Sequence, residues 1–492
     1  MNDDIQLIIP ILLPVLCGLL LCLFGKRLPA NRSRGVCILV MLAAEAVLTI
    51  LIFSRGKSLF LWKLNDEIGI FFRVDDLSRI FGILVVCVWF LVGVYACEYM
   101  RHEEKYISFF GFYLMAEGML TAIAVAGNMI TFYMFFEMMT ILTFPLVMHD
   151  RTPAAIRAGL KYLFYSVAGA LMTLFAIFEL KPYGMLGNFM PGGILDIEAL
   201  TGHENVLLIS ALLLIIGLGT KAGMFPMHAW LPTAHPEAPA PASAVLSGVI
   251  TKSGVIGIIR GIYYAIGPRL IAGTWVQRTW LVLSLLTVLM GSMLAYREPV
   301  LKKRLAYSTV SQVSYMLFGL AILNSTAFTG AVLHIVFHSL IKTTLFLVAG
   351  AVIHQTAHTR VDELKAIGKD MPITIWCYTI VSIALIGIPP LSGFVSKWYL
   401  ATGALMSGVD PYSWAGPVIL LISALLTAGY LLPITIRGFF PGKEYDYDLR
   451  RKKEPDPVMY APMIIMAALT VILGLFPGIL CSVIEKITMV VF

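Results

Sequence analysis

Charged side chains are scarce in this sequence. Asp, Glu, Lys and Arg make up 13% of the 492 residues, whereas soluble domains carry about 25%. Hydrophobic residues account for 59%, and the mean hydropathy is +0.86. This composition excludes a disordered chain and a basic nucleic-acid-binding domain, so nucleic acid is not an expected partner. It indicates a membrane protein that crosses the lipid bilayer many times.

Cofactor motifs are absent as well. The chain has neither a Walker A sequence nor a GxGxxG loop, and its seven cysteines form no CxxC pair of the kind that holds an iron–sulfur cluster. We therefore expect no cofactor, no bound metal and no catalytic residue in this chain, and assign any redox chemistry to partner chains. A basic leader and a cleavage site are also lacking before the first apolar run, so we expect the first helix to remain in the mature protein.

Apolar runs of about 20 residues predict fourteen transmembrane helices and an all-α polytopic fold. The helices are expected near residues 5–24, 35–54, 77–97, 107–126, 128–149, 158–180, 206–230, 241–266, 275–295, 305–323, 327–354, 371–403, 414–436 and 459–490. Two long connections, 55–76 and 182–205, join them on one side. Neither connection is expected to form a soluble domain.

The distribution of positive charge tests this layout. With the N-terminus outside, 22 of the 36 Lys and Arg residues fall in inner loops and 10 in outer segments. The last inner loop holds the largest group: Arg437, Lys443, Arg450, Arg451, Lys452 and Lys453. The positive-inside rule then places both termini on the outer side, and the net charge of +7 needs no acidic ligand.

Charged residues inside the apolar runs are the candidate functional residues. Five of them stand out: Glu137, Lys221, Lys252, Lys342 and Lys397. A charge at the bilayer centre costs about 2.5–3.5 kcal/mol or more, so these side chains must face a protein interior or water. They can be structural ion pairs or lysines that reach the interface. Alternatively they form a proton or cation path, because a Glu–Lys pair that makes and breaks lets the lysine bind and release a proton.

Two histidines precede Lys342 on one helix face, since His334, His338 and Lys342 are four residues apart. Such a pair can bind zinc, can be hydrogen-bonded in a core, or can relay protons because imidazole titrates between pH 5 and 8. The missing HExxH pattern and third ligand favour the relay.

Two of the predicted helices contain breaks. Five prolines lie between Pro226 and Pro241, just after Lys221, and Pro389 and Pro390 lie just before Lys397. Interrupted helices line ion paths in transporters. The lysine precedes the break in one helix and follows it in the other, so this pattern alone leaves an internal repeat undecided.

Seven stretches resemble a known family: the antiporter-like proton-translocating subunits shared by respiratory complex I, Mrp-type cation/proton antiporters and membrane-bound energy-converting hydrogenases. The stretches are VDDLSRIF, FYMFFEMMTILTF, KAGMFPMHAWLPTAHPEAPAPASAVLSG, ITKSGVIGIIR, KKRLAYSTVSQVSYM, HIVFHSLIKTTLFLVAGAV and IPPLSGFVSKWYL. They span roughly residues 74–400. The resemblance implies one transmembrane domain, with N-terminal helices (1–106), two inverted five-helix repeats (107–266 and 275–436), each with one broken helix, and a C-terminal helix (459–492).

The resemblance also implies residue roles. Glu137 pairs with Lys221, and the path continues through Lys252, His334, His338 and Lys342 to the terminal Lys397. His228 matches a histidine with a structural role. Glu117 lies at a position to which the resemblance assigns no role, and is either part of a local pair or an accessory ion ligand. Asn128 stands where many relatives have an Asp, just before the fifth helix. This difference weakens any claim that ions enter the protein at that point.

The expected function is therefore a proton-translocating subunit of a multisubunit complex in the cell (inner) membrane, moving H⁺ and, in an exchanger, Na⁺. Its partners would be other membrane subunits, with iron–sulfur, hydrogenase, or NADH- or ferredoxin-oxidising subunits in a redox-driven complex. The sequence of residues 235–248, HPEAPAPASAVLSG, favours a hydrogenase-type or Mrp-type complex over complex I. A non-conducting scaffold and a stand-alone ion-coupled solute transporter are the alternatives.

Overall fold

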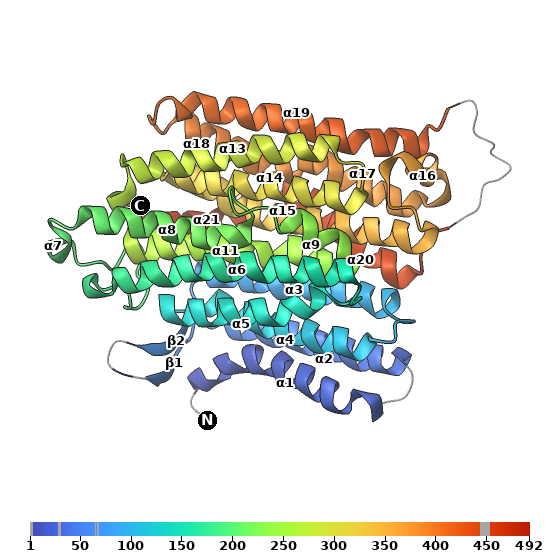
Figure 1. Cartoon of the computed structure of the whole chain (residues 1–492), viewed down its shortest axis with the longest axis horizontal. Helices are drawn as coiled ribbons and strands as arrows, with labels where there is room; N and C mark the ends of the chain where they lie inside the picture. Colours follow the sequence, from blue (N-terminus) through green and yellow to red (C-terminus); the bar gives the residue numbers. More distant parts are fainter. Residues whose placement is uncertain (1–2, 28–30, 64, 66–67, 443–452) are drawn as a thin grey trace.

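A computed structural model describes residues 3–27, 31–63, 65, 68–442 and 453–492 of the chain. Most of these residues form helices that run along one common direction (Figure 1). Twelve of the helices in these ranges are long and apolar enough to cross a membrane. Helices predominate because inside a bilayer every backbone N–H and C=O must find its partner within the chain. The predicted all-α polytopic fold is confirmed.

The N-terminal part combines long helices with a small hairpin. Its elements are η1 (Asp3–Ile8), α1 (Ile9–Phe24), η2 (Gly25–Arg27), α2 (Asn31–Ser54), β1 (Ser58–Lys63), β2 (Gly69–Arg73) and α3 (Asp76–Tyr99). The two strands pair antiparallel, with an irregular register between Phe60 and Trp62. This hairpin occupies the first long connection and packs against the helices, so the connection is structured without being a separate domain.

The middle part contains the first helix break. Its elements are α4 (Tyr106–Val125), α5 (Met129–Val147), α6 (Pro153–Glu179), η3 (Lys181–Tyr183), α7 (Ile197–Leu200), α8 (Glu204–Ala222), α9 (Leu231–Glu237), α10 (Ala240–Val245), η4 (Leu246–Ile250), α11 (Thr251–Ile258), η5 (Ile259–Ile266) and α12 (Pro268–Ile271). Helix α8 ends where Gly223 adopts a φ of +77°, a conformation that favours glycine. The predicted 206–230 helix therefore ends earlier than expected. From α10 to η5 the chain forms one buried span in which η4 and η5 are π-helical.

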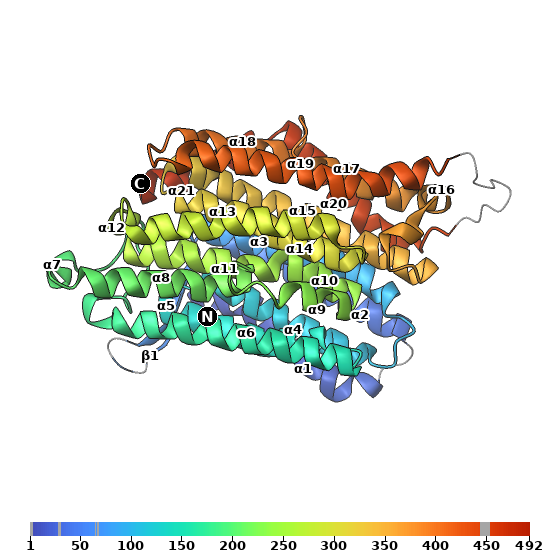
Figure 2. The same ribbon diagram turned by 45° about the horizontal axis from the view of Figure 1, so that its top comes forward.

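The C-terminal part is built around one long buried helix. Its elements are α13 (Trp275–Arg297), α14 (Leu301–Ala321), α15 (Ser325–Thr356), η6 (Val361–Leu364), α16 (Ile367–Asp370), α17 (Pro372–Ile386), α18 (Ser392–Leu405), α19 (Tyr412–Phe439), α20 (Pro457–Leu475) and α21 (Gly478–Val491). Every residue of α15 from Ala327 to Val352 is buried, because α3, α10, α14, α17, α18, α20 and α21 surround it (Figure 2).

Two of the fourteen predicted positions are not among the twelve long apolar helices. Helix α14 begins with the basic residues Lys302, Lys303 and Arg304, and the helix predicted at 371–403 is divided into α17 and α18. Helix α14, and α17 together with α18, still lie within the helix bundle (Figure 2). The helix predicted at 459–490 is also divided, into α20 and α21. The division of the chain into two inverted repeats stays a prediction.

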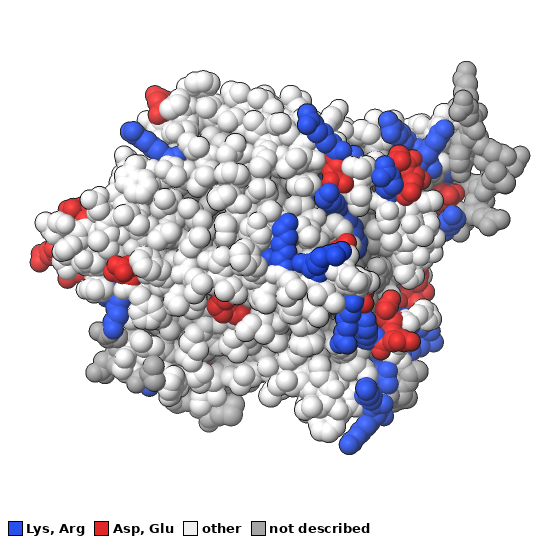
Figure 3. Space-filling model, in the orientation of Figure 1, with Lys and Arg blue, Asp and Glu red and all other residues white. Residues whose placement is uncertain are grey.

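Basic side chains gather at one end of the bundle, the end that carries α16 (Figure 3). At the opposite end lie the hairpin and both ends of the described chain, since η1 contacts β1 and the Arg269 side chain donates to the carbonyl oxygen of Phe492. The described basic residues thus follow the predicted asymmetry. Lys443, Arg450, Arg451 and Lys452 lie outside the described residues.

Candidate functional site

Lys221 lies in the last turn of α8 with 1% of its surface exposed. Its Nζ donates to the hydroxyl oxygens of Thr140 and Tyr162 at 2.8 Å each, and to that of Ser166 at 3.1 Å. The rings of Tyr162 and Phe136 lie 4.5 and 5.6 Å from the same nitrogen, close enough for cation–π attraction. Neutral oxygens and aromatic faces from α5 and α6 therefore surround the amine in place of water.

Glu137 lies on α5, one turn before Thr140. Its Oε1 is buried and has no hydrogen-bond partner, and its charge interacts with that of Lys221. The two side chains form no direct ion pair, because the lysine amine bonds to the three hydroxyls instead. Glu137 and Lys221, the pair implied by the family resemblance, therefore interact electrostatically but do not form an ion pair in this conformation.

Lys252 and Lys342 are completely buried and bond only to backbone oxygens. Lys252 Nζ donates to the carbonyl of Ser247 in the π-helical segment η4, and Lys342 Nζ donates to the carbonyl of Leu305 at 3.1 Å. A π-helical turn changes the backbone bonding of a helix and is frequent at functional sites. The two lysines and His338 are close enough to interact electrostatically.

The two histidines of α15 continue the line from Lys342. Their ring centres are 5.6 Å apart. His334 Nδ1 bonds to the Ser396 hydroxyl of α18 at 2.9 Å, whereas His334 Nε2 and both ring nitrogens of His338 are buried without a partner. Free ring nitrogens next to one another suit a proton relay, since each can accept and donate a proton.

Lys397 lies at the second helix break. Its Nζ donates to the carbonyls of Leu385 and Ile386 at 2.6 and 3.0 Å. These are terminal carbonyls of α17, which have no partner within the helix and carry partial negative charge. The Tyr315 ring lies 4.9 Å from this amine and 5.7 Å from the His334 ring, so Lys397 and the histidines are linked through Tyr315 and Ser396.

The structure thus brings the predicted residues into two groups. Lys252, His334, His338, Lys342 and Lys397 form one series, and Glu137 with Lys221 forms the other. Helices α8 and α11 approach closely between the groups, where a Cβ on Gly254 would lie 3.1 Å from that of Lys221 and 2.5 Å from the Leu218 carbonyl oxygen. No hydrogen bond among the described side chains joins Lys221 to Lys252.

His235 and Lys302 belong to the same interior and were missed in the sequence. His235 is completely buried, both its ring nitrogens lack a partner, and its ring stacks on Phe346 at 4.6 Å. It interacts electrostatically with Lys302, Lys342 and Lys252. Lys302 Nζ donates to the carbonyl of Ala238 at 2.7 Å. The sequence signal that could have identified His235 is its position inside the proline-rich break. The sequence analysis instead selected charged residues with apolar flanks and the histidines in line with Lys342.

The accessory candidates lie elsewhere. His228 stacks on Phe225 with ring centres 5.9 Å apart, and its buried Nδ1 has no partner. Glu117 lies on α4, among the N-terminal helices and apart from the series of lysines. Within the described ranges, no three His, Cys, Asp or Glu side chains gather as a metal-ligand set.

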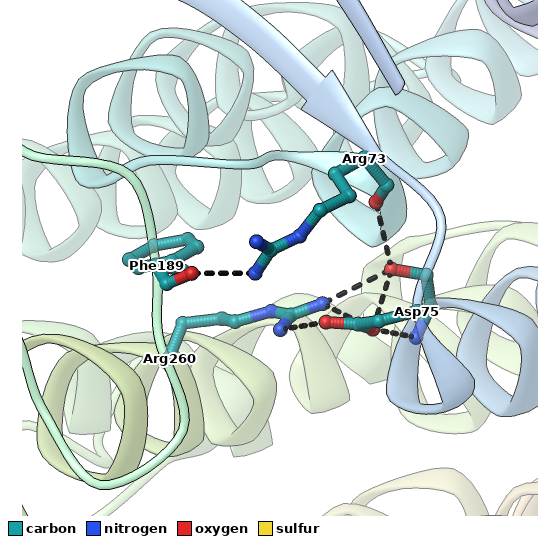
Figure 4. Close-up of polar contacts among 5 residues, drawn as sticks. Arg73, Asp75, Phe189 and Arg260 are labelled. Carbon is teal, nitrogen blue, oxygen red and sulfur yellow. Dashed lines mark hydrogen bonds and ion pairs between the residues drawn. The ribbon is translucent and has the colours of Figure 1, made fainter. Parts of the chain in front are cut away.

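A buried ion pair closes the hairpin end of the span that carries Lys252 (Figure 4). Arg260, 1% exposed, donates to the two carboxylate oxygens of Asp75 at 2.5 and 2.8 Å, and Arg73 donates to the carbonyl of Phe189. Burial acts to raise the pKa of Asp75, but the Arg260 charge and hydrogen bonds from Ser78 outweigh it and hold that pKa at about 2. Asp75 therefore stays ionised and keeps Arg260 paired.

Three curated proteins show the breadth of the sequence similarity. NADH-quinone oxidoreductase subunit N of Desulforudis audaxviator is 31% identical over 83% of this chain and 82% of its own length. Hydrogenase-4 component B of Escherichia coli is 30% identical over 82% of this chain and 62% of its own length. A Na⁺/H⁺ antiporter subunit of Alkalihalophilus pseudofirmus is 28% identical over 95% of this chain and 93% of its own length.

Solved structures share the fold. A chain of the archaeal membrane-bound sulfane sulfur reductase superposes with a TM-score of 0.83 over 99% of this chain and 98% of that one, at 21% identity. A chain of the Mrp complex from Dietzia superposes with a TM-score of 0.84 over all of this chain and 52% of that one, at 22% identity. Both are chains of multisubunit membrane complexes.

Family models match most of the chain. The model described as "NADH:quinone oxidoreductase/Mrp antiporter, TM" matches residues 126–427. The model described as "NADH-Ubiquinone oxidoreductase (complex I), chain 5 N-terminus" matches residues 64–110. The resemblance identified from the seven motifs is confirmed, and this chain belongs to the NADH:quinone oxidoreductase/Mrp antiporter family of transmembrane subunits.

Proposed function

We propose that this chain is a proton-translocating subunit of a multisubunit membrane complex, and that protons move along Glu137, Lys221, Lys252, the three α15 residues His334, His338 and Lys342, and Lys397. One observation carries the proposal. Lys221, Lys252 and Lys342 are buried in the bundle and Lys397 is partly buried, and among the described residues the hydrogen-bond partners of all four are neutral oxygens.

Neutral partners make such lysines able to exchange protons. A buried ammonium that is paired with a carboxylate is held in its charged form, whereas one that bonds to carbonyls or hydroxyls loses much less by releasing its proton. The nearby Glu137 supplies the variable element, because closing or opening its contact with Lys221 changes the proton affinity of the lysine. A structural ion-pair role for the four lysines is correspondingly disfavoured.

The driving force and the setting belong to the same proposal. We place the protein in the cell membrane with its basic end and inner loops toward the cytoplasm and both termini outside. Other membrane subunits adjoin it, and the chain holds no cofactor, so energy comes from redox subunits or from an exchanged cation. The similarity to subunits of an oxidoreductase, a hydrogenase and a Na⁺/H⁺ antiporter supports either source.

The test is proton movement by the assembled complex in sealed vesicles, read with a pH-sensitive dye. We expect Lys221→Ala, and separately Glu137→Ala, to reduce coupled proton movement to about a tenth or less, a loss typical when a positioned proton-transfer group is removed. Lys486→Ala, on the surface of α21, is the matched control and should pump normally.

Assembly must be measured alongside, because an unfolded subunit would also fail to pump. Co-purification of the partner subunits with each variant provides this check. Undiminished pumping by an assembled Lys221→Ala complex would refute the path. Loss of pumping in the control as well would show that the assay reports damage rather than the removal of a path residue.

A further inference from the structure

A second set of charged side chains lies outside the proposed path. Glu45 of α2 and Glu117 of α4 are 1% and 0% exposed, and their carboxyl groups are close enough to interact electrostatically. They are enclosed by the N-terminal helices α1 to α4, at the lower edge of Figure 1, away from the buried helix α15. The proposed proton path uses neither residue.

Among the residues that the structure describes, no basic group balances this pair. Helix α1 contains no charged residue, α4 contains only Glu117, and the charges of α3 lie in its first and last turns. The basic residues of α2, Arg32 and Arg34, belong to its first turn, about 16 Å from Glu45 at 1.5 Å per residue. The other titratable neighbours are Cys17 of α1 and Tyr113 of α4, both neutral in their ordinary states.

The charge state of the pair follows from this isolation. Two carboxyl groups that interact in a buried site cannot both be ionised, so they hold at least one proton between them. With one proton the pair carries a single negative charge, and an unpaired buried charge is costly. Either a second proton or a bound monovalent cation removes that cost.

Two threonine hydroxyl groups lie about one helical turn from the glutamates. Thr49 and Thr121 follow the two glutamates by four residues, on the same helix faces, and α2 and α4 run in the same direction. Both threonines are completely buried and their Oγ1 atoms have no hydrogen-bond partner. Other buried threonines in this bundle, such as Thr143, instead donate to the carbonyl four residues earlier.

We propose that Glu45, Thr49, Glu117 and Thr121 form a Na⁺ site in which the cation replaces a proton. Five oxygens of these side chains are buried without a hydrogen-bond partner: Glu45 Oε1, Thr49 Oγ1, both carboxyl oxygens of Glu117, and Thr121 Oγ1. Carboxylate and hydroxyl oxygens are the ligands that hard cations prefer. A pair that holds one proton offers one negative charge, which a monovalent cation neutralises.

The exchange balances in charge. The site is neutral with two protons on the carboxyl groups, and neutral again with one proton and one Na⁺, so each Na⁺ that binds releases one H⁺. The inference is independent of the proposed proton path, because no residue is shared and Na⁺ binding can be measured without pumping.

Equilibrium binding of ²²Na⁺ to the purified complex tests the site. We expect Glu45→Gln and Glu117→Gln to bind less Na⁺ per chain than wild type. Thr121→Val should bind with an affinity at least about tenfold weaker, the size of effect seen even for outer groups of metal sites. The exposed Glu179→Gln on α6 is the matched control and should bind as wild type does. Dye-monitored proton release on Na⁺ addition should be smaller in the two glutamine variants.

A hydrophobic carbodiimide gives a second readout, because a protonated carboxyl group adds across its C=N bond and leaves an adduct that peptide mass spectrometry locates. The reagent can approach from a hollow of about 360 Å³ between α1 and α2, whose lining includes Cys17 and Met41. We expect NaCl, compared with choline chloride at equal ionic strength, to lower the combined adduct at Glu45 and Glu117, because the pair then holds one proton instead of two, and to leave that at Glu137 unchanged.

Either readout can overturn the proposal. Equal Na⁺ uptake by wild type and both glutamine variants, with the complex assembled, would show that the carboxyl pair binds protons only. An equal combined amount of adduct at Glu45 and Glu117 in NaCl and in choline chloride would lead to the same conclusion, that the pair binds protons only. If neither glutamate reacts with the carbodiimide, the Na⁺-binding measurement alone decides. Retained pumping by Lys221→Ala would refute the proton path without affecting these results.

Discussion

The side chain of Arg260 is 1% exposed, and its buried positive charge is balanced by the carboxylate of Asp75. The pKa of Asp75 is about 2, below the ordinary value of about 3.9. A carboxyl group with a lowered pKa stabilises the fold above its ordinary pKa, and this stabilisation disappears as the pH falls toward the lowered value. The linkage corresponds to about 2–3 kcal/mol.

We therefore expect the thermal stability of the detergent-solubilised protein to fall between about pH 4 and pH 2 as Asp75 takes up a proton. Asp75→Asn should lose about 3–5 kcal/mol already at neutral pH, because Arg260 is then buried without a partner. It should also show a smaller further decline in acid. The midpoint of thermal unfolding, followed by tryptophan fluorescence across this pH range, measures both effects.

Asp76→Asn is the matched control. Asp76 forms an ion pair with Arg79 in which both side chains are about one-third exposed, and such pairs contribute about 1 kcal/mol or less. Acid sensitivity equal to that of wild type in Asp75→Asn would show that other carboxyl groups cause the acid loss.

At this scale the sequence could predict which lysines are buried but not what they contact. Lys221 stands out because a charge in an apolar run is rare. Its partners Thr140, Tyr162 and Ser166 lie 55 to 81 positions away along the chain, and one sequence contains no distance between helices. Glu45 carried the same signal, since it too is a charge in an apolar run, but it was overlooked, and His235 was missed because a histidine in a proline-rich stretch is no distinctive pattern.

At the scale of the elements, each broken helix carries a lysine, but the two lysine amines donate to different kinds of hydrogen-bond acceptor. At the first break, the amine of Lys221 points to hydroxyls of neighbouring helices. At the second, Lys397 bonds to the terminal carbonyls of the preceding half-helix, α17. The prolines and glycines predicted both breaks, since proline removes a backbone donor and glycine permits a positive φ. The α17 carbonyls that the second break leaves free could not be paired with Lys397 from the sequence.

The second break leads to a prediction about Lys397. Lys397→Met should leave the carbonyls of Leu385 and Ile386 without a partner and remove the last proton carrier of the series. We expect coupled proton movement to fall to about a tenth or less, as for other positioned proton-transfer groups, while partner subunits still co-purify. Proton uptake by vesicles that contain the assembled complex is the measurement.

Lys365→Met provides the comparison, since Lys365 is exposed at the basic end and its loss should leave pumping intact. Normal pumping by assembled Lys397→Met would limit the path to the residues before α18. It would also assign Lys397 a role in closing the helix break.

For the whole molecule, the all-α polytopic fold followed from apolar run length and the charge asymmetry from loop composition, because the bilayer imposes both. The hairpin of β1 and β2 did not follow, since β1 and β2 are short and only one of them is buried. The orientation of the bundle in the membrane is a prediction from the same asymmetry: the end that carries α16 faces the cytoplasm.

Two single-cysteine variants can test this orientation in a background without the native cysteines. Thr201→Cys is exposed at the hairpin end and Glu363→Cys is exposed at the basic end. Because Lys and Arg are retained on the cytoplasmic side during insertion, a membrane-impermeant maleimide should label Thr201→Cys in intact cells and Glu363→Cys only after the cells are opened. The reverse pattern would show that the bundle has the opposite orientation, with the end that carries α16 outside.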